Sequence, residues 1–249
     1  LNNSELLYET LKQHQEQLAC VIIEPIPANN GLLLQDLSFL RSLRKWCTEL
    51  NILLIFDEVI SGFRVSFGGA AEYYQIEPDI VTYGKIIGGG LPVGAYAAKN
   101  EIMSHVSPEG PVYQAGTLSG NPVAMSAGIA QLSKCAEEGF YENQQHRTLE
   151  FISSINSFCA SKDYPIKIVS IGSIFWFSFA GDKSIKSADQ INPEMSHFSR
   201  LYNLLLNNGV YIGPSGYEVG FVSFAHDVSV LKMASKLFCE AIDQTFTKS

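Results

Sequence analysis

Two short apolar runs, each ending near one ionisable side chain, form the clearest pattern in this sequence. Residues 53–59 read Leu-Leu-Ile-Phe-Asp-Glu-Val, and residues 79–85 read Asp-Ile-Val-Thr-Tyr-Gly-Lys. Continuous apolar character is typical of strands that are buried on both faces, as in parallel sheets. Ligands of such sheets bind at the carboxyl ends of the strands, so Asp57 and Lys85 are candidates for chemistry. On spacing alone, a helix cap or surface ion pair for Asp57 and a solvated loop position for Lys85 remain open.

The segments around these runs alternate between strand and helix patterns. A strand is predicted over residues 19–24 and a helix over residues 37–50, with Asp36 as its cap. Strand, helix and strand in this order form a βαβ unit. The other elements predicted before Gly139 are helices over residues 4–17, 70–75 and 122–138, the last capped by Asn121, and a strand over residues 92–98.

The pattern changes after Gly139. Helices are predicted over residues 141–161 and 193–207 and after Asp227, and short strands over residues 166–171, 174–179, 210–212 and 220–224. These strands do not recur at a fixed crossover spacing, which indicates an α+β arrangement. We therefore expect an α/β protein with two domains: residues 1–139, with a mainly parallel sheet and helices, and residues 140–249, a smaller α+β domain.

Composition narrows the class of protein. The chain has 249 residues, of which 46% are hydrophobic, and a formal net charge of −8 without any lysine- or arginine-rich block. This charge argues against nucleic acid as a partner. No apolar run approaches the ~20 residues of a membrane span, so we expect no membrane partner. Five scattered cysteines without ligand spacing are typical of reduced thiols in a cytoplasmic protein.

Several familiar site motifs are absent. The Gly-rich residues 88–90 adjoin Gly84 and Lys85, but Ile86 stands where a phosphate-binding P-loop has Ser or Thr. No H-E-x-x-H or comparable spacing occurs, and the adjacent carboxylates of Asp57 and Glu58 lack partner carboxylates at helical spacing. We expect no metal site.

Residues 116–122 are more informative. They read Gly-Thr-Leu-Ser-Gly-Asn-Pro and directly precede a predicted helix. Backbone N–H groups and hydroxyls at such a position can hold a phosphate, although an ordinary capped helix start explains them equally well. An acid for a pyridine nitrogen, a lysine for an aldehyde carbon and a phosphate cradle together fit pyridoxal phosphate.

The sequence resembles the class III aminotransferases, which are pyridoxal-phosphate enzymes of fold type I, from about residue 21 to its end. Four stretches carry the resemblance: Glu24-Pro25 with Asn29, residues 54–64, residues 78–94 and residues 110–122. The resemblance implies that residues 1–139 are the C-terminal part of the cofactor-binding large domain and that residues 140–249 are the small C-terminal domain. It also implies pyridoxal 5'-phosphate and pyridoxamine 5'-phosphate as cofactors.

The resemblance gives roles to residues near the two apolar runs. Lys85 looks like the lysine that forms the Schiff base and moves protons between cofactor and substrate. Asp57 would pair with the pyridine nitrogen and keep it protonated. Val59 would pack on the ring face, which agrees with its position in a core strand, and Asn29 is expected near the ring hydroxyl.

Further roles fall on two loops. Gly116 and Thr117 are expected to reach the cofactor phosphate of the partner subunit in a homodimer with shared active sites, with Tyr113 close by. Glu218 is expected on the substrate side, because related ω-aminotransferases tend to carry a carboxylate-binding arginine in this region. Without the resemblance, Glu218 would be interpreted as an exposed loop carboxylate.

Within the family, the resemblance is strongest to the aminomutase branch. It implies an intramolecular amino transfer that converts glutamate 1-semialdehyde into 5-aminolevulinate, a precursor of tetrapyrroles such as porphyrins, with Lys85 as general acid and base. The alternatives are an ω-amino acid or diamine aminotransferase of the same family, and a catalytically silent fragment or binding module. The mutase needs no external keto acid, which separates it from the first alternative.

The sequence departs from the family in its length. Family members are longer at the N-terminus by about two-fifths of a chain, and the sequence given begins with Leu1 rather than Met. The missing part carries the ring-stacking, substrate-carboxylate and gating residues. We therefore interpret the chain as a fragment or processed product and expect little aminomutase activity from it alone.

Overall fold

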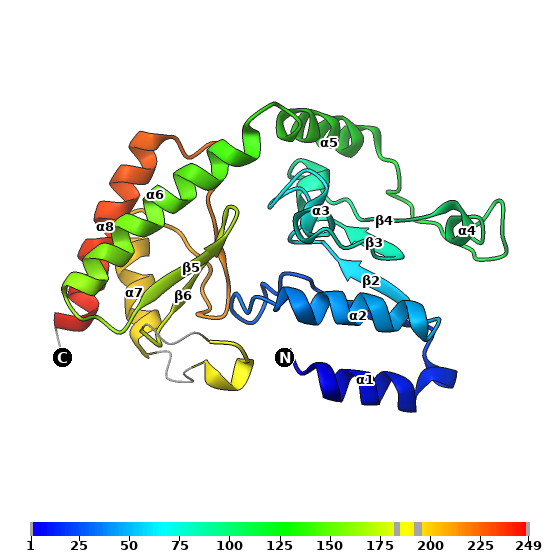
Figure 1. Ribbon diagram of the computed structural model, residues 1–249. Helices are drawn as coiled ribbons and strands as arrows, with labels where there is room; N and C mark the ends of the chain where they lie inside the picture. Colours follow the sequence, from blue (N-terminus) through cyan, green and yellow to red (C-terminus); the bar gives the residue numbers. More distant parts are fainter. Residues whose placement is uncertain (1, 182–184, 192–195, 248–249) are drawn as a thin grey trace. The chain divides into compact units, whose positions relative to one another are not determined.

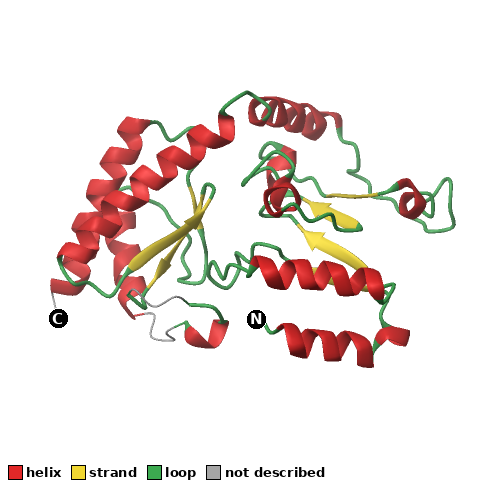
Figure 2. Cartoon of the chain, in the orientation of Figure 1, coloured by secondary structure: helices red, strands yellow, loops and turns green. Residues whose placement is uncertain are grey.

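The computed structural model describes residues 2–181, 185–191 and 196–247. The chain forms two compact units, each described by itself below. The first consists of Leu1–Ile26 and Gln35–Phe140, and the second of Pro27–Leu34 and Tyr141–Ser249. Figure 1 labels the helices and strands in chain order, and Figure 2 colours them by type.

A four-stranded sheet organises the first unit. Its order is β1 (Cys20–Ile23), β2 (Leu53–Asp57), β3 (Ile80–Tyr83) and β4 (Ala95–Ala98). The first three strands are parallel, with Ile23 opposite Phe56 and Asp57 opposite Thr82, whereas β4 is antiparallel to β3. The expected α/β class with a mainly parallel sheet is confirmed. The helices of this unit are α1 (Ser4–Gln13), α2 (Leu37–Glu49), α3 (Gly69–Tyr74), α4 (Asn100–Met103), α5 (Pro122–Cys135) and the short 3-10 helices η1 (Gln15–Gln17) and η2 (Lys85–Gly88).

One face of this sheet packs against helices. Leu54 and Phe56 of β2 are fully buried, and they form one core with Leu11 of α1 and with Leu40 and Leu43 of α2. The amphipathic spacing of α2 puts these leucines on a single side of the helix. This packing fixes β2, and therefore the position of Asp57 at its end.

The opposite face of the sheet is open in this chain. Ile22, which pairs with Ile55, is 60% exposed, and Leu53 and Tyr96 of the same face are more than one-third exposed. Parallel sheets are normally covered on both faces. In the described part of the chain, this face of the sheet therefore leaves the apolar side chains of Ile22, Leu53 and Tyr96 exposed.

A three-stranded antiparallel sheet packs with helices to form the second unit. Its strands are β5 (Lys167–Ile171), β6 (Ile174–Ser178) and β7 (Gly220–Phe221), in that order. Helices α6 (Phe140–Ser161), α7 (Ser196–Asn207) and α8 (Val228–Thr247), which are labelled in Figure 1, contribute side chains to one core with β5 and β6. The short helix η3 (Ala188–Gln190) lies in the loop after β6. Phe175 and Phe177 of β6 point into this core, and the buried Trp176 lies between them in sequence.

The strand expected at residues 210–212 is wrong. Val210 and Ile212 pack against the core of the second unit, whereas Tyr211 between them is 74% exposed. The alternating pattern therefore reflects side-chain packing without strand pairing, and β7 takes the third place in the sheet. The predicted start of the preceding helix at Pro193 lies outside the described residues.

Two predicted helix caps and the cysteines follow the sequence more closely, whereas Asp36 stands at the start of α2 without a side-chain capping bond. Asn121 Oδ1 accepts hydrogen bonds from the backbone N–H groups of Val123 and Ala124, at 3.0 and 3.2 Å, and Asp227 Oδ1 accepts one from the Val230 N–H. All five cysteines lie in the described part of the chain, and none forms a disulfide. Among the described helices, none combines the length and the apolar character that crossing a membrane requires.

The buried Cys47 thiol of α2 predicts an alkaline loss of stability in the first unit. Burial raises the pKa of Cys47 from 9.0 to about 11. A raised pKa stabilises the fold fully below pH 9, and this contribution is lost as the pH rises through 11. Between these values, the unfolding free energy of the wild-type chain is expected to fall by roughly 2–3 kcal/mol more than that of Cys47→Ala. Denaturant titrations at several pH values, followed by the fluorescence of Trp46 in a Trp176→Phe background, measure this difference; parallel pH curves would contradict it.

Candidate active site at the carboxyl ends of β2 and β3

Asp57 lies at the carboxyl end of β2 with one carboxylate oxygen occupied. Its Oδ1 accepts a hydrogen bond from the Val59 N–H at 3.0 Å and one from Thr82 Oγ1 at 3.4 Å. The bond from Thr82 follows from the parallel register that places Thr82 opposite Asp57, whereas the bond from Val59 is a local contact two residues along the chain. Within the described residues, Asp57 Oδ2 has no hydrogen-bond partner. The carboxylate is thus oriented by one oxygen while the other is open to a donor.

Lys85 begins η2 directly after β3. Its backbone has φ +47°, in the left-handed region that a lysine rarely adopts. Strain of this kind is often found at functional sites. The side chain is exposed, and in the part of the chain that the structure describes Nζ has no hydrogen bond or ion pair. The amine is therefore accessible to a ligand.

Close backbone contacts fix the turn that carries Lys85. A Cβ at Gly84 would come within 3.2 Å of Val59 Cγ1, so the Val59 side chain packs directly on this glycine. On the other side of the turn, a Cβ at Gly128 would overlap the Ile87 carbonyl oxygen, so α5 packs on η2 through backbone. The structure thereby brings Asp57, Val59 and Lys85 to one end of the sheet.

The Gly-Thr loop borders a hollow of the same unit. The hollow has a volume of about 770 Å³, and Gly116 and Thr117 line it together with Tyr83 of β3 and Ile129 of α5. Most other lining side chains are apolar. Tyr113 is 83% exposed and does not line this hollow.

Asn29 and Glu218 belong to the second unit, where the structure brings their loops together. The Gly31 N–H donates to the Tyr217 carbonyl oxygen at 2.7 Å. Trp176 Nε1 donates to the Gly216 carbonyl oxygen at 2.8 Å, and its ring lies against Gly31. Asn29 and Glu218 are both exposed. Trp176 therefore joins two loops that the sequence analysis treated separately.

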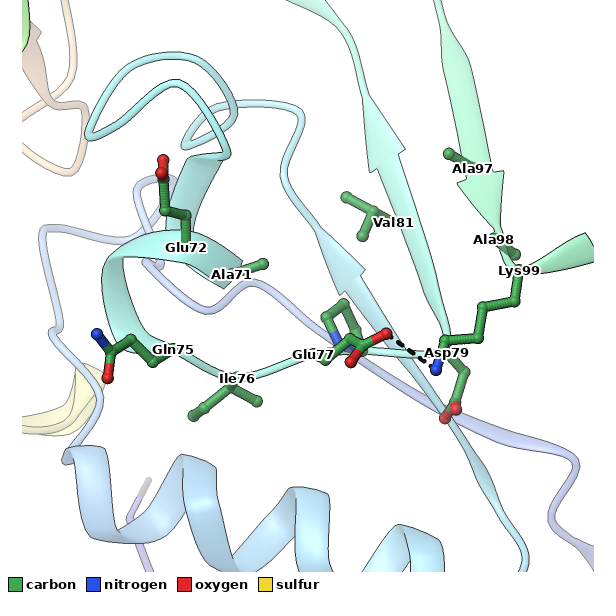
Figure 3. Close-up of a pocket in the computed structure, with 11 residues that line it drawn as sticks. Ala71, Glu72, Gln75, Ile76, Glu77, Asp79, Val81, Ala97, Ala98 and Lys99 are labelled. Atoms are coloured by element: carbon green, nitrogen blue, oxygen red, sulfur yellow. Dashed lines mark ion pairs between the residues drawn. The ribbon is translucent and has the colours of Figure 1, made fainter.

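A second hollow lies at the opposite end of β3 and does not contain the predicted site. Figure 3 shows Val81, Ala97 and Ala98 of the sheet beside Ala71 and Ile76, with charged side chains at the rim. Its volume is about 540 Å³, and its rim holds an ion pair of 2.9 Å between Lys99 Nζ and Glu77 Oε1. Because Lys85 follows the other end of β3, this hollow and the candidate site are separate.

The sequence pattern did not predict a role for Thr82 or for Glu58. Thr82 orients Asp57, and only the register of two strands reveals it. Glu58 is fully buried and accepts hydrogen bonds from Ser61, Ala70 and Ala71. A second acidic residue directly after the apolar strand run was the available sequence signal for Glu58. No group of three or more metal-ligating side chains occurs among the described residues.

Comparison with known proteins places this chain in a family. The profile of the family "Aminotransferase class-III" matches residues 2–246. The chain therefore belongs to the class III aminotransferase family, and the resemblance found in the sequence is confirmed.

Individual relatives agree with this assignment. The chain is 46% identical over 235 residues to a glutamate-1-semialdehyde 2,1-aminomutase of Leptospira biflexa, covering 94% of this chain and 55% of the relative. An omega-transaminase structure from Sphaerobacter thermophilus matches with a TM-score of 0.91 at 28% identity, covering 98% of this chain and 56% of that chain. A structure described as a transaminase with PLP bound matches with a TM-score of 0.88 at 28% identity, covering 100% and 57%. These neighbours confirm that the chain has part of the fold type I architecture. The chain spans about half the length of the relatives it matches.

Proposed function

We propose that this chain is part of a pyridoxal-phosphate-dependent aminomutase that converts glutamate 1-semialdehyde into 5-aminolevulinate, for tetrapyrrole synthesis. The name of the Leptospira relative and the family assignment support this reaction. The observation that carries the proposal is the pair of available groups at neighbouring strand ends. Asp57 Oδ2 and Lys85 Nζ both lack partners within the described residues, and they are the two groups that the cofactor ring and aldehyde require.

The residues present fit the cofactor. Asp57 would accept a hydrogen bond from the pyridinium N–H through its open oxygen, while Thr82 and the Val59 N–H hold the other oxygen in place. Val59 would pack on the ring face from its position beside Gly84. Bound pyridoxal phosphate supplies an electron sink and carries the amino group. Lys85 would bind the cofactor aldehyde and move protons as general acid and base.

We further propose a homodimer with shared active sites. Leu118 and Ile129, which line the hollow together with Gly116 and Thr117, are each more than 60% exposed. Apolar side chains gathered on one surface of a protein commonly mark an interface. A second copy that covers them would bring its cofactor phosphate to Gly116 and Thr117, with Tyr113 nearby. From the family resemblance, we also propose a role near the ring hydroxyl for Asn29 and a role on the substrate side for Glu218.

An ω-aminotransferase is the second candidate, because the Sphaerobacter neighbour has this activity by name. The two reactions differ in their need for an external keto acid. Turnover of glutamate 1-semialdehyde without a keto acid supports the mutase. Turnover only with added keto acid supports the aminotransferase.

Borohydride reduction after addition of pyridoxal phosphate tests the cofactor site directly. Peptide mass mapping is expected to find the pyridoxyl group on Lys85. Lys99 serves as the internal control, because its hydrogen bond with Glu77 raises the pKa of its amine and keeps it protonated. Equal modification of Lys85 and Lys99 would remove the assignment.

A further inference from the structure

Glu58 lies between Asp57 and Val59, but the proposed function gives it no task. It is the one charged side chain that is buried among the described residues, with 0% exposure. Its carboxylate accepts hydrogen bonds from the N–H groups of Ala70 and Ala71, at 2.5 and 2.9 Å, and from Ser61 Oγ at 3.0 Å. Its backbone N–H donates to the Thr82 carbonyl oxygen at 3.0 Å. One residue thus connects the end of β2 with β3, the following turn and the start of α3.

The chain around Glu58 is built to admit this carboxylate. Position 69 requires glycine for two reasons. Its φ of +69° is unfavourable for other residues, and a Cβ there would overlap Glu58 Oε2. Burial raises the pKa of the Glu58 carboxyl, and the hydrogen bonds from Ala70, Ala71 and Ser61 oppose that rise. Ser61 belongs to the turn after β2, whereas Ala70 and Ala71 belong to α3, so the Glu58 carboxylate ties this turn to the start of α3.

The turn at residues 59–63 packs against Tyr83 and Gly84, the two residues that precede Lys85. The Phe63 ring lies 5.3 Å from the Tyr83 ring, and a Cβ at Gly62 would come within 2.7 Å of that ring. Phe63 itself has φ +57°, which needs support from its surroundings. Val59, at the start of the turn, packs on Gly84. The turn therefore limits where β3 can place η2.

We propose that Glu58 is a positioning residue that holds the Lys85 amine in reach of a ring bound at Asp57. It acts through the turn at residues 59–63, which its carboxylate closes and which contacts Tyr83 and Gly84. Glu58 itself is sealed from the site and contacts neither cofactor nor substrate. This inference rests on the proposed function, and it adds a reason why a carboxylate follows Asp57 directly.

The test compares Glu58→Gln with Glu72→Gln. A glutamine at position 58 has one acceptor oxygen, and its NH₂ group would face backbone donors, so the turn loses hydrogen bonds. Glu72 is the matched control, because its Oε2 accepts from the Gly68 N–H at 2.7 Å on the same helix start, but in an exposed position. Glu58→Gln is expected to slow pyridoxyl labelling of Lys85 about tenfold relative to wild type. It is also expected to raise amide hydrogen exchange at residues 83–87. Glu72→Gln should change neither quantity.

The outcomes separate this inference from the proposed function. Absence of Lys85 labelling in the wild-type chain would remove the proposed function, and the positioning role with it. Wild-type labelling together with unchanged exchange and labelling in Glu58→Gln would overturn the positioning role alone. Faster exchange at residues 83–87 with unchanged labelling would also overturn it, because Glu58 would then be merely structural.

A milder variant covers the case that Glu58→Gln fails to fold. Ser61→Ala removes one of the three donors and keeps the carboxylate. Its labelling of Lys85 is expected to fall severalfold, in the same direction and with the same change in exchange. Wild-type labelling and exchange in folded Ser61→Ala would overturn the inference.

Discussion

Replacing Lys85 with arginine is expected to lower reductive attachment of pyridoxal phosphate at this position about 100-fold or more. Arginine keeps the positive charge and the length of the side chain, but its guanidinium stays protonated and forms no Schiff base under these conditions. The variant is expected to fold normally, because the Lys85 side chain is exposed and has no partner in the described structure. Mass mapping of the reduced protein measures the loss.

The matched control for this variant is Lys99→Arg. Lys99 lies just beyond the other end of the same sheet, where it pairs with Glu77. Labelling at Lys85 should be unchanged in Lys99→Arg. If Lys85→Arg instead left the total incorporation of cofactor intact, labelling would be distributed over surface lysines and the Schiff-base assignment would be wrong.

Replacing Phe56 with alanine is expected to cost about 3–5 kcal/mol of unfolding free energy in the first unit. Phe56 is 0% exposed, next to Asp57, and packs in the core that α1 and α2 form with the sheet. The cost combines the lost burial of the ring with the cavity that it leaves. Because domains are stable by only ~5–15 kcal/mol, this single change brings the first unit close to unfolding.

Fluorescence separates the two units in this experiment, since Trp46 belongs to the first and Trp176 to the second. Denaturant unfolding of Phe56→Ala should shift the transition of Trp46, measured with Trp176→Phe, much more than that of Trp176, measured with Trp46→Phe. Ile22→Ala is the control, because this strand residue is 60% exposed and its loss should change the free energy by less than ~0.5 kcal/mol. Equal effects of Phe56→Ala and Ile22→Ala would contradict the packing described here.

The sequence predicted those parts of the site that depend on local pattern. The apolar runs before Asp57 and Lys85 indicated parallel strands that are buried on both faces. The register of β2 and β3 confirms the parallel pairing, whereas the burial on both faces is wrong, because Leu53 is exposed and β3 is only partly buried. Asn121 was predicted as a cap from its position before Pro122, and its side chain makes the capping bonds. These features need only neighbouring residues, so the sequence pattern contains them.

The remaining features depend on contacts between distant residues. The hydrogen bonds of Glu58 join it to Ala70 and Ala71, twelve and thirteen positions away. The bond between Gly31 and Tyr217 spans most of the chain. Periodicity carries no information about such pairs, and glycines that permit a close approach look like ordinary turn glycines in a sequence.

The segment Pro27–Leu34 makes the folding of the second unit depend on residues that precede most of the first unit in sequence. It leaves the first unit after β1, packs with Trp176 and Tyr217 in the second, and then returns to α2. A protease cut after Gly139 would therefore not release two complete units, because the second unit would lose the segment Pro27–Leu34 that lies against Trp176. During synthesis, this segment can form its hydrogen bond with Tyr217 only after the ribosome has added almost two hundred further residues. The loop that carries Asn29 is consequently among the last parts of the chain to acquire its final contacts.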